Sequence, residues 1–154
     1  FKPTKKGEDG KDISNDTIKF STIKSIAGFL NSRDATLVIG VVDSKNSATN
    51  EPEVKGIEFD EFSGDEDKYN RDLNRQIINA LGETAASFVK LEIQTIDGKK
   101  VCRINCNKST QPVYCNFRGK AINVPFVRTD TITEQPKTYK DWHDWLKHHF
   151  PNSI

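Results

Sequence analysis

The pattern of apolar positions singles out residues 16–43 as the stretch around which the chain is organised. In its first half, apolar side chains recur at three- and four-residue steps, at Ile23, Ala27 and Leu30. This spacing predicts an amphipathic helix. The run over 37–42 is short, β-branched and almost entirely apolar, and it predicts a strand buried on both faces. Asp43 ends this strand and has two interpretations: it belongs to a site framed by the helix and the strand, or it only opens the polar turn that follows.

A second amphipathic helix is predicted over about 69–81, with Gly82 as its C-terminal stop. Its apolar stripe consists of Leu73, Ile77 and Leu81. Arg71 and Arg75 lie four residues apart on one face of this helix, where they either meet a phosphate or are simply solvated.

The clearest strand signal covers 88–96, where apolar and polar residues alternate. Asp97-Gly98 predicts a hairpin turn, and 99–106 returns as the partner strand. On that strand, Val101 and Arg103 share one face while Cys102, Ile104 and Cys106 share the other. Shorter β segments are predicted over 54–59, 112–115 and 122–128.

The chain ends in a predicted helix that Thr138 caps, with Asp141 three residues on. Trp142 and Trp145 lie on it at helical spacing and suit either a docking surface or a base-stacking platform. The order of elements predicts a single α+β domain over 1–154 in which helices pack on a mostly antiparallel sheet. The polar stretch 1–13 predicts a flexible loop.

Composition is that of a globular protein, with 34% hydrophobic and 29% charged residues among 154. The net charge of +1 by itself predicts no polyanionic partner. The distribution is more informative, because the predicted hairpins carry a basic group that suits either phosphate binding or solvated strand faces. These residues are Lys99, Lys100, Arg103, Lys108, Arg118, Lys120 and Arg128.

Three cysteines without a CxxC pair, and no secretion signal or membrane span, predict reduced thiols in a cytoplasmic protein. The chain begins at Phe1 and contains no methionine, so we expect native residues upstream of it and interpret the chain as a fragment of a larger protein.

Several catalytic motifs are absent from the sequence: the GxxxxGK[ST] phosphate loop, GxGxxG, HExxH and GxSxG. The remaining pattern, acidic and basic residues around a buried strand, is compatible with metal-assisted phosphodiester chemistry, in which carboxylates hold a hard divalent cation. Asp43 is the carboxylate whose position best suits that role.

Read in order, several segments of the chain resemble the Schlafen-type AlbA-like domain. These are FKP, IKSIAGFLNS, TLVIGVVD, VKGIEF, LNRQIINALG, SFVKLEIQTIDGKKVCRINC, STQPVY and FVRTDTIT. The family pattern contains an E-F-K tripeptide, a K-x-I-x-A-F-x-N helix, a glycine pair, an I-G-V-x-D strand end, an S-x-x-P-V segment and an R-x-G-x-[ST] turn.

This resemblance implies a nucleic-acid-binding α+β domain, and some Schlafen relatives are metal-dependent ribonucleases. Lys2 matches the lysine of E-F-K and becomes a candidate phosphate contact. Asp43 matches the catalytic aspartate of the I-G-V strand, and Arg128 matches the arginine of the R-x-G turn. The family's catalytic glutamates would lie before Phe1.

Two positions depart from the family pattern. Asp34 and Ala35 replace the glycine pair, and Asp130 replaces the glycine of the R-x-G turn. A carboxylate at position 130 weakens a simple phosphate cradle, although it could also add a metal ligand.

Three functional hypotheses follow. The leading one is binding to the phosphate backbone of RNA or DNA by Lys2, Lys99, Lys100, Arg103, Arg118 and Arg128. The second is a Mg²⁺- or Mn²⁺-dependent nuclease with Asp43 as a catalytic residue and metal ligand. The third is a protein-interaction module in which the C-terminal helix docks on a neighbouring domain or a second copy, forming a homodimer.

Overall fold

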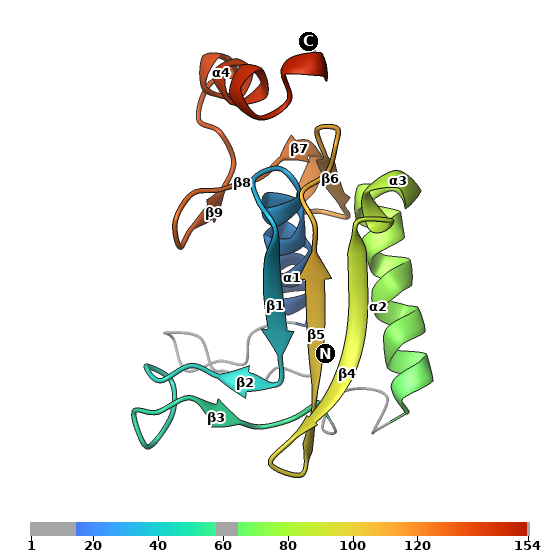
Figure 1. Ribbon diagram of the computed structural model, residues 1–154, viewed down its shortest axis with the longest axis vertical. Helices are drawn as coiled ribbons and strands as arrows, with labels where there is room; N and C mark the ends of the chain where they lie inside the picture. Colours follow the sequence, from blue (N-terminus) through green and yellow to red (C-terminus); the bar gives the residue numbers. More distant parts are fainter. Residues whose placement is uncertain (1–14, 58–64, 154) are drawn as a thin grey trace.

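The computed structural model describes residues 15–57 and 65–153, shown in Figure 1. The predicted loop over 1–13 and the candidate contact Lys2 lie outside the described residues. The predicted α+β class is confirmed: helices pack against small antiparallel sheets.

The main sheet contains three antiparallel strands in the order β1-β5-β4. Their bounds are Ala35–Ile39 for β1, Val89–Ile96 for β4 and Lys99–Cys106 for β5. The predicted hairpin is therefore confirmed, with Ile96 paired to Lys99 across the turn. Cys102, Ile104 and Cys106 face inward and are buried, as their alternation predicted.

Two long helices supply the core that covers this inner face. They are α1 (Asn15–Leu30), which lies behind the sheet in Figure 1, and α2 (Glu66–Leu81), which lies beside β4. The predicted apolar stripes of both helices are buried in one cluster with the inner face of β5. Helix α2 begins three residues earlier than predicted because the Asp65 side chain accepts a hydrogen bond from the Lys68 N–H at 3.1 Å. Gly82 ends the helix as predicted.

The prediction of one strand over 37–42, buried on both faces, is wrong. Strand β1 ends at Ile39, and Gly40 has a φ of +105°, which turns the chain out of the sheet. Strand β1 is also an edge strand without a helix on its outer face, and Val38 there is 40% exposed. The apolar run therefore continues as β2 (Val41–Val42), which pairs with β3 (Glu53–Val54) in a separate ribbon at the lower end of the molecule in Figure 1.

The second half of the chain forms two further short ribbons. Strand β6 (Tyr114–Phe117) pairs with β7 (Ala121–Pro125), and β8 (Val127–Arg128) pairs with β9 (Thr133–Glu134). The sequence did not predict helix α3 (Glu83–Ala86) or the 3-10 turn η1 (Pro151–Ser153). In the part of the chain that the structure describes, no helix has the length and apolarity needed to cross a lipid bilayer.

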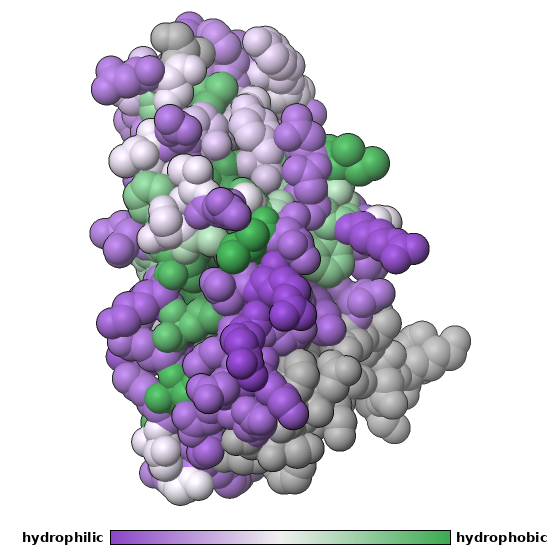
Figure 2. All heavy atoms as spheres, turned by 90° about the vertical axis from the view of Figure 1, so that its right-hand side faces the viewer, coloured by the Kyte–Doolittle hydropathy of each residue, from purple (hydrophilic) through white to green (hydrophobic). Residues whose placement is uncertain are grey.

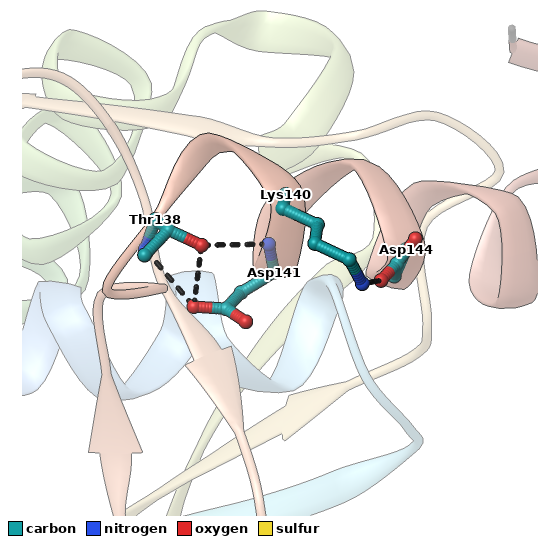
Figure 3. Close-up of polar contacts among 4 residues, drawn as sticks. All are labelled: Thr138, Lys140, Asp141 and Asp144. Atoms are coloured by element: carbon teal, nitrogen blue, oxygen red, sulfur yellow. Dashed lines mark hydrogen bonds and ion pairs between the residues drawn. The ribbon is translucent and has the colours of Figure 1, made fainter.

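The C-terminal helix α4 (Tyr139–His149) begins where the sequence predicted. Figure 3 shows its capping box, in which the Thr138 hydroxyl accepts from the Asp141 N–H and the Asp141 carboxylate accepts from the Thr138 N–H. Both tryptophans contact their own chain: Trp142 Nε1 lies 3.3 Å from the Tyr114 hydroxyl, and Trp145 Nε1 donates to the Asn31 carbonyl at 3.1 Å. Docking of this helix on another domain or copy stays a prediction.

Candidate nucleic-acid interface

The basic residues proposed from the sequence lie in different parts of the structure. Lys99 and Lys100 start β5, at the end of the sheet beside the β2–β3 ribbon. Arg103 lies further along β5 on the outer face of the sheet, opposite Val38 and Glu92. Arg118 lies in the β6–β7 turn and Arg128 in β8, so these cations do not form one continuous face.

The two lysines at the sheet end already have partners. Lys99 Nζ donates to the Val54 carbonyl at 3.1 Å, which ties the hairpin to β3. Lys100 Nζ lies 2.7 Å from Glu66 Oε1 at the start of α2. A phosphate would have to compete with this carboxylate for Lys100.

Arg103 belongs to a network of polar side chains across the outer face of the sheet. Asn105 Oδ1 accepts from Thr36 Oγ1 at 3.0 Å and from Arg103 Nη2 at 3.4 Å, while Asn105 Nδ2 donates to Glu92 Oε2 at 3.0 Å. The hydrogen bond from Lys90 is the main cause that lowers the pKa of Glu92. The ionised Glu92 therefore offsets part of the positive charge on this face.

Arg128 has a structural role in the described part of the chain. Its Nη1 donates to Thr133 Oγ1 at 2.9 Å, its backbone N–H donates to Ser32 Oγ at 2.8 Å, and its guanidinium carbon lies 5.2 Å from the centre of the Phe29 ring. The side chain thus holds β8 and β9 against the end of α1. The side chain is half-buried, and its Nε atom is buried without a hydrogen-bond partner in the described chain. Its role as a phosphate contact stays a prediction.

One of the two departures from the family pattern, Asp34, stabilises a loop through its side chain. The contact made by Asp130 uses its backbone carbonyl, which a glycine would also supply. Asp34 Oδ1 accepts from the Lys108 N–H at 2.7 Å, so this carboxylate joins the loop after α1 to the end of β5. The Asp130 carbonyl accepts from Arg33 Nη2 at 2.9 Å, which fixes the β8–β9 turn.

Asp43 follows β2 and is exposed. Its Oδ1 accepts from the Asn46 N–H at 3.0 Å and from Asn46 Nδ2 at 2.7 Å, so this carboxylate opens a polar turn. It also lines a hollow of about 410 Å³ together with Glu53 and Lys55, which form an ion pair at 2.7 Å. Within residues 15–57 and 65–153, no three His, Cys, Asp or Glu side chains are grouped so that they could hold a metal ion. The catalytic role of Asp43 stays a prediction.

The cysteines are free thiols in the interior. Burial raises the pKa of Cys102 and Cys106 to about 12 and that of Cys115 to about 11. They are therefore protonated near neutral pH, which makes them poor nucleophiles.

A different set of cations has no partner among the described residues. Arg71 and Arg75 on α2 and Arg118 in the β6–β7 turn are exposed, and none of them forms a hydrogen bond or ion pair with the residues that the structure describes. The four-residue spacing of the two α2 arginines is visible in the sequence, but their lack of a partner in the described chain is not. Figure 2 looks onto this α2 side, where hydrophilic side chains cover much of the surface.

Arg118 also lines a cleft of about 650 Å³. This cleft lies between α2, the β6–β7 turn and the first turn of α1. Its lining residues are Asp16, Gln76, Asn79, Ala80, Asn116, Phe117, Arg118 and Gly119. Of these residues, the sequence indicated only Arg118 as a candidate contact. Amide side chains that are far apart in the sequence do not indicate a binding site until the fold brings them together.

The domain is of the α+β class, with two helices packed on one face of a three-stranded antiparallel sheet. The family model described as Schlafen, AlbA_2 matches residues 2–137, and the chain belongs to this family, which confirms the resemblance.

Comparison with solved structures supports the fold. The chain is similar to the crystal structure of the DIP2311 protein from Corynebacterium diphtheriae, with a TM-score of 0.59 and 11% sequence identity. The match covers 96% of this chain and 27% of that protein, so the chain spans about a quarter of its length. A comparison with curated proteins finds no match.

Proposed function

We propose that this domain binds the phosphate backbone of RNA or DNA, and that the face formed by α2 and the β6–β7 turn makes the contact. The observation that carries the proposal is a set of exposed arginines, Arg71, Arg75 and Arg118, that have no partner in the part of the chain that the structure describes. Cations without protein partners can neutralise phosphates and release counterions without first breaking an ion pair. Membership of the Schlafen AlbA_2 family supports the same function.

Helix geometry and the lining of the cleft relate the two α2 arginines to Arg118. Arg71, Arg75 and Asn79 follow each other at four-residue spacing, which places them along one stripe of α2. Asn79 and Arg118 line the same cleft, so the stripe leads to the β6–β7 turn. From Arg71 to Asn79 the helix rises about 12 Å, which is the length of three to four stacked nucleotides.

Three phosphate contacts predict weak, salt-dependent binding. The slope of log K against log[salt] should be about −2 to −3. The test is binding of labelled single- and double-stranded oligonucleotides by the full chain over a range of salt concentrations. The variant Arg71→Ala/Arg75→Ala/Arg118→Ala should bind more weakly at low salt, and its slope should fall by about one for each cation removed.

The matched control is Lys99→Ala/Lys100→Ala/Arg103→Ala, which removes the same charge from the sheet end. This control should retain most of the affinity. If it abolishes binding while the α2 variant binds normally, the sheet end is the interface and the proposed face is wrong. Salt-insensitive binding, or no binding to either nucleic acid, rules out backbone recognition altogether.

The second candidate function is divalent-metal-dependent cleavage, with Mg²⁺ or Mn²⁺ as cofactor. The observation that favours it is the presence of Asp43 and Glu53 in one hollow beside Lys55. The described residues do not supply a complete metal site. In this alternative, Asp43→Ala abolishes cleavage measured with Mn²⁺ and leaves binding intact. Cleavage that survives the substitution, or that persists in chelator, excludes it.

A further inference from the structure

The cleft between α2 and the β6–β7 turn is lined by amide, carboxylate and aromatic side chains, which a site for phosphate alone does not need. We propose that it holds one unstacked nucleobase of a single-stranded nucleic acid, with Arg118 at the adjoining phosphate. The inference rests on the proposed function and extends it, because it specifies the form of the nucleic acid. The volume of about 650 Å³ is within the range typical of small-ligand sites.

The amide side chains of the cleft present both hydrogen-bond donors and acceptors. Gln76 Nε2 donates to Asp72 Oδ2, which leaves the Gln76 carbonyl oxygen as an acceptor. Asn116 Oδ1 accepts from the Asn123 N–H at 2.8 Å, which leaves its NH₂ group as a donor. Carboxamides with a free donor or acceptor group can form hydrogen bonds with the edges of nucleobases, which also carry both donors and acceptors.

Asn79 is the free amide of the set. It is exposed, lines the cleft, and forms no side-chain hydrogen bond with the described residues. The carboxylate of Asp16 adds a further acceptor at the first turn of α1. Acceptors repel a phosphate but can bind the amino groups of a base, so the lining favours a base over an anion.

An aromatic wall completes the site. Phe117 lines the cleft and is half-buried, and its ring centre lies 5.4 Å from that of Phe20 on α1. This packing holds the ring in place, and a fixed aromatic ring is a stacking surface for an unpaired base. Arg118 follows Phe117 directly and is exposed, so it can reach the phosphate of a nucleotide whose base occupies the cleft.

A duplex cannot present a base in this way without unpairing it, so the cleft predicts a preference for single strands. The experiment compares the unaltered chain with Asn79→Ala on a single-stranded oligonucleotide and on a duplex of the same sequence. Asn79→Ala should weaken single-strand binding about fivefold or more and leave duplex binding unchanged. Asn74→Ala is the matched control, because Asn74 is exposed on the same helix and does not line the cleft. It should change neither affinity.

A second measurement follows the side-chain amide resonances of Asn79, Asn116 and Gln76 by NMR during titration with a nucleoside monophosphate and, separately, with inorganic phosphate. Shifts with the nucleotide alone support the proposal. Equal shifts with inorganic phosphate overturn it, as does equal weakening of single-strand and duplex binding by Asn79→Ala. Unchanged binding by Asn79→Ala overturns the cleft proposal only, whereas the absence of binding by the unaltered chain overturns the proposed function as well.

Discussion

Asn31 and Val113 exchange two hydrogen bonds across the interior of the domain. Asn31 Nδ2 donates to the Val113 carbonyl at 2.8 Å, and the Val113 N–H donates to Asn31 Oδ1 at 2.7 Å. Asn31 Nδ2 also donates to the Phe126 carbonyl at 2.8 Å. This side chain is fully buried, and its amide nitrogen and its carbonyl oxygen both have partners, so it joins the end of α1 to the chain before β6 and the chain before β8.

Replacing Asn31 by alanine should destabilise the domain strongly. The substitution leaves three buried backbone groups of Val113 and Phe126 without partners, each of which costs about 1–3 kcal/mol. We therefore expect a loss of about 3 kcal/mol or more in the free energy of unfolding, measured by urea denaturation. Asn107→Ala, at an exposed position, should stay within about 0.5 kcal/mol of the unaltered protein. A loss below about 1 kcal/mol for Asn31→Ala would show that the network is not needed.

Gly40 should be far less tolerant of alanine than Gly119. Both have a positive φ, +105° and +71° respectively, so both substitutions introduce backbone strain of about 1 kcal/mol or more. At Gly40 a Cβ atom would also lie 3.2 Å from the Gly56 carbonyl carbon and 3.3 Å from side-chain atoms of Ile57 and Val101, whereas at Gly119 no atom of the described residues lies within 4 Å. Gly40→Ala should therefore lower the thermal midpoint more than Gly119→Ala does. Equal shifts would mean that the ribbon moves aside without cost.

The same glycine shows what local pattern can and cannot predict. Helices α1, α2 and α4 and the β4–β5 hairpin follow from signals close together in the sequence: apolar spacing, the Thr138 cap, and the Asp97-Gly98 turn, whose φ values of +50° and +73° suit a two-residue hairpin. The break at Gly40 depends instead on a distant segment. Its carbonyl accepts from the Lys55 and Gly56 N–H groups at 2.8 and 2.9 Å, and no spacing within 37–42 reveals that contact.

The candidate interface is harder to predict from the sequence than the helices and the hairpin, because it also depends on contacts between distant segments. Sequence identifies which residues are cationic, but tertiary contacts decide which of them have partners. Lys100 is paired with Glu66, while Arg71 and Arg75 lack a partner in the described chain. The amides of the cleft come from α2 and the β6–β7 turn, which only the folded chain brings together.

His149 should make the docking of α4 sensitive to pH. Its ring stacks on Trp145 with centroids 3.9 Å apart, and burial is the main cause that lowers its pKa, with the charge of Lys108 adding to the effect. Because the folded pKa lies below the unfolded value, the unfolded state binds the proton first, and stability falls as pH drops below about 6.5. Thermal unfolding from pH 7.5 to 5 should show this loss.

Substitution separates His149 from the other titrating groups. His149→Gln should reduce the difference between the midpoints at pH 7.5 and pH 5. His148→Gln should reduce it less, because the charge of His148 is only a minor cause that lowers the pKa of His149. If both variants keep the full difference, His149 is not its source.

The buried thiols provide a test of how tightly the core is closed. Cys102, Cys106 and Cys115 are at most 1% exposed, and burial raises the pKa of each. Since the thiolate is the reactive form, a disulfide reagent at pH 7.5 should modify none of them in the native state, and all three together when the chain unfolds. The labelling rate should therefore increase with urea in parallel with unfolding. Rapid labelling of one thiol without denaturant would reveal local opening of the strand that carries it, β6 in the case of Cys115 and β5 in the case of the other two.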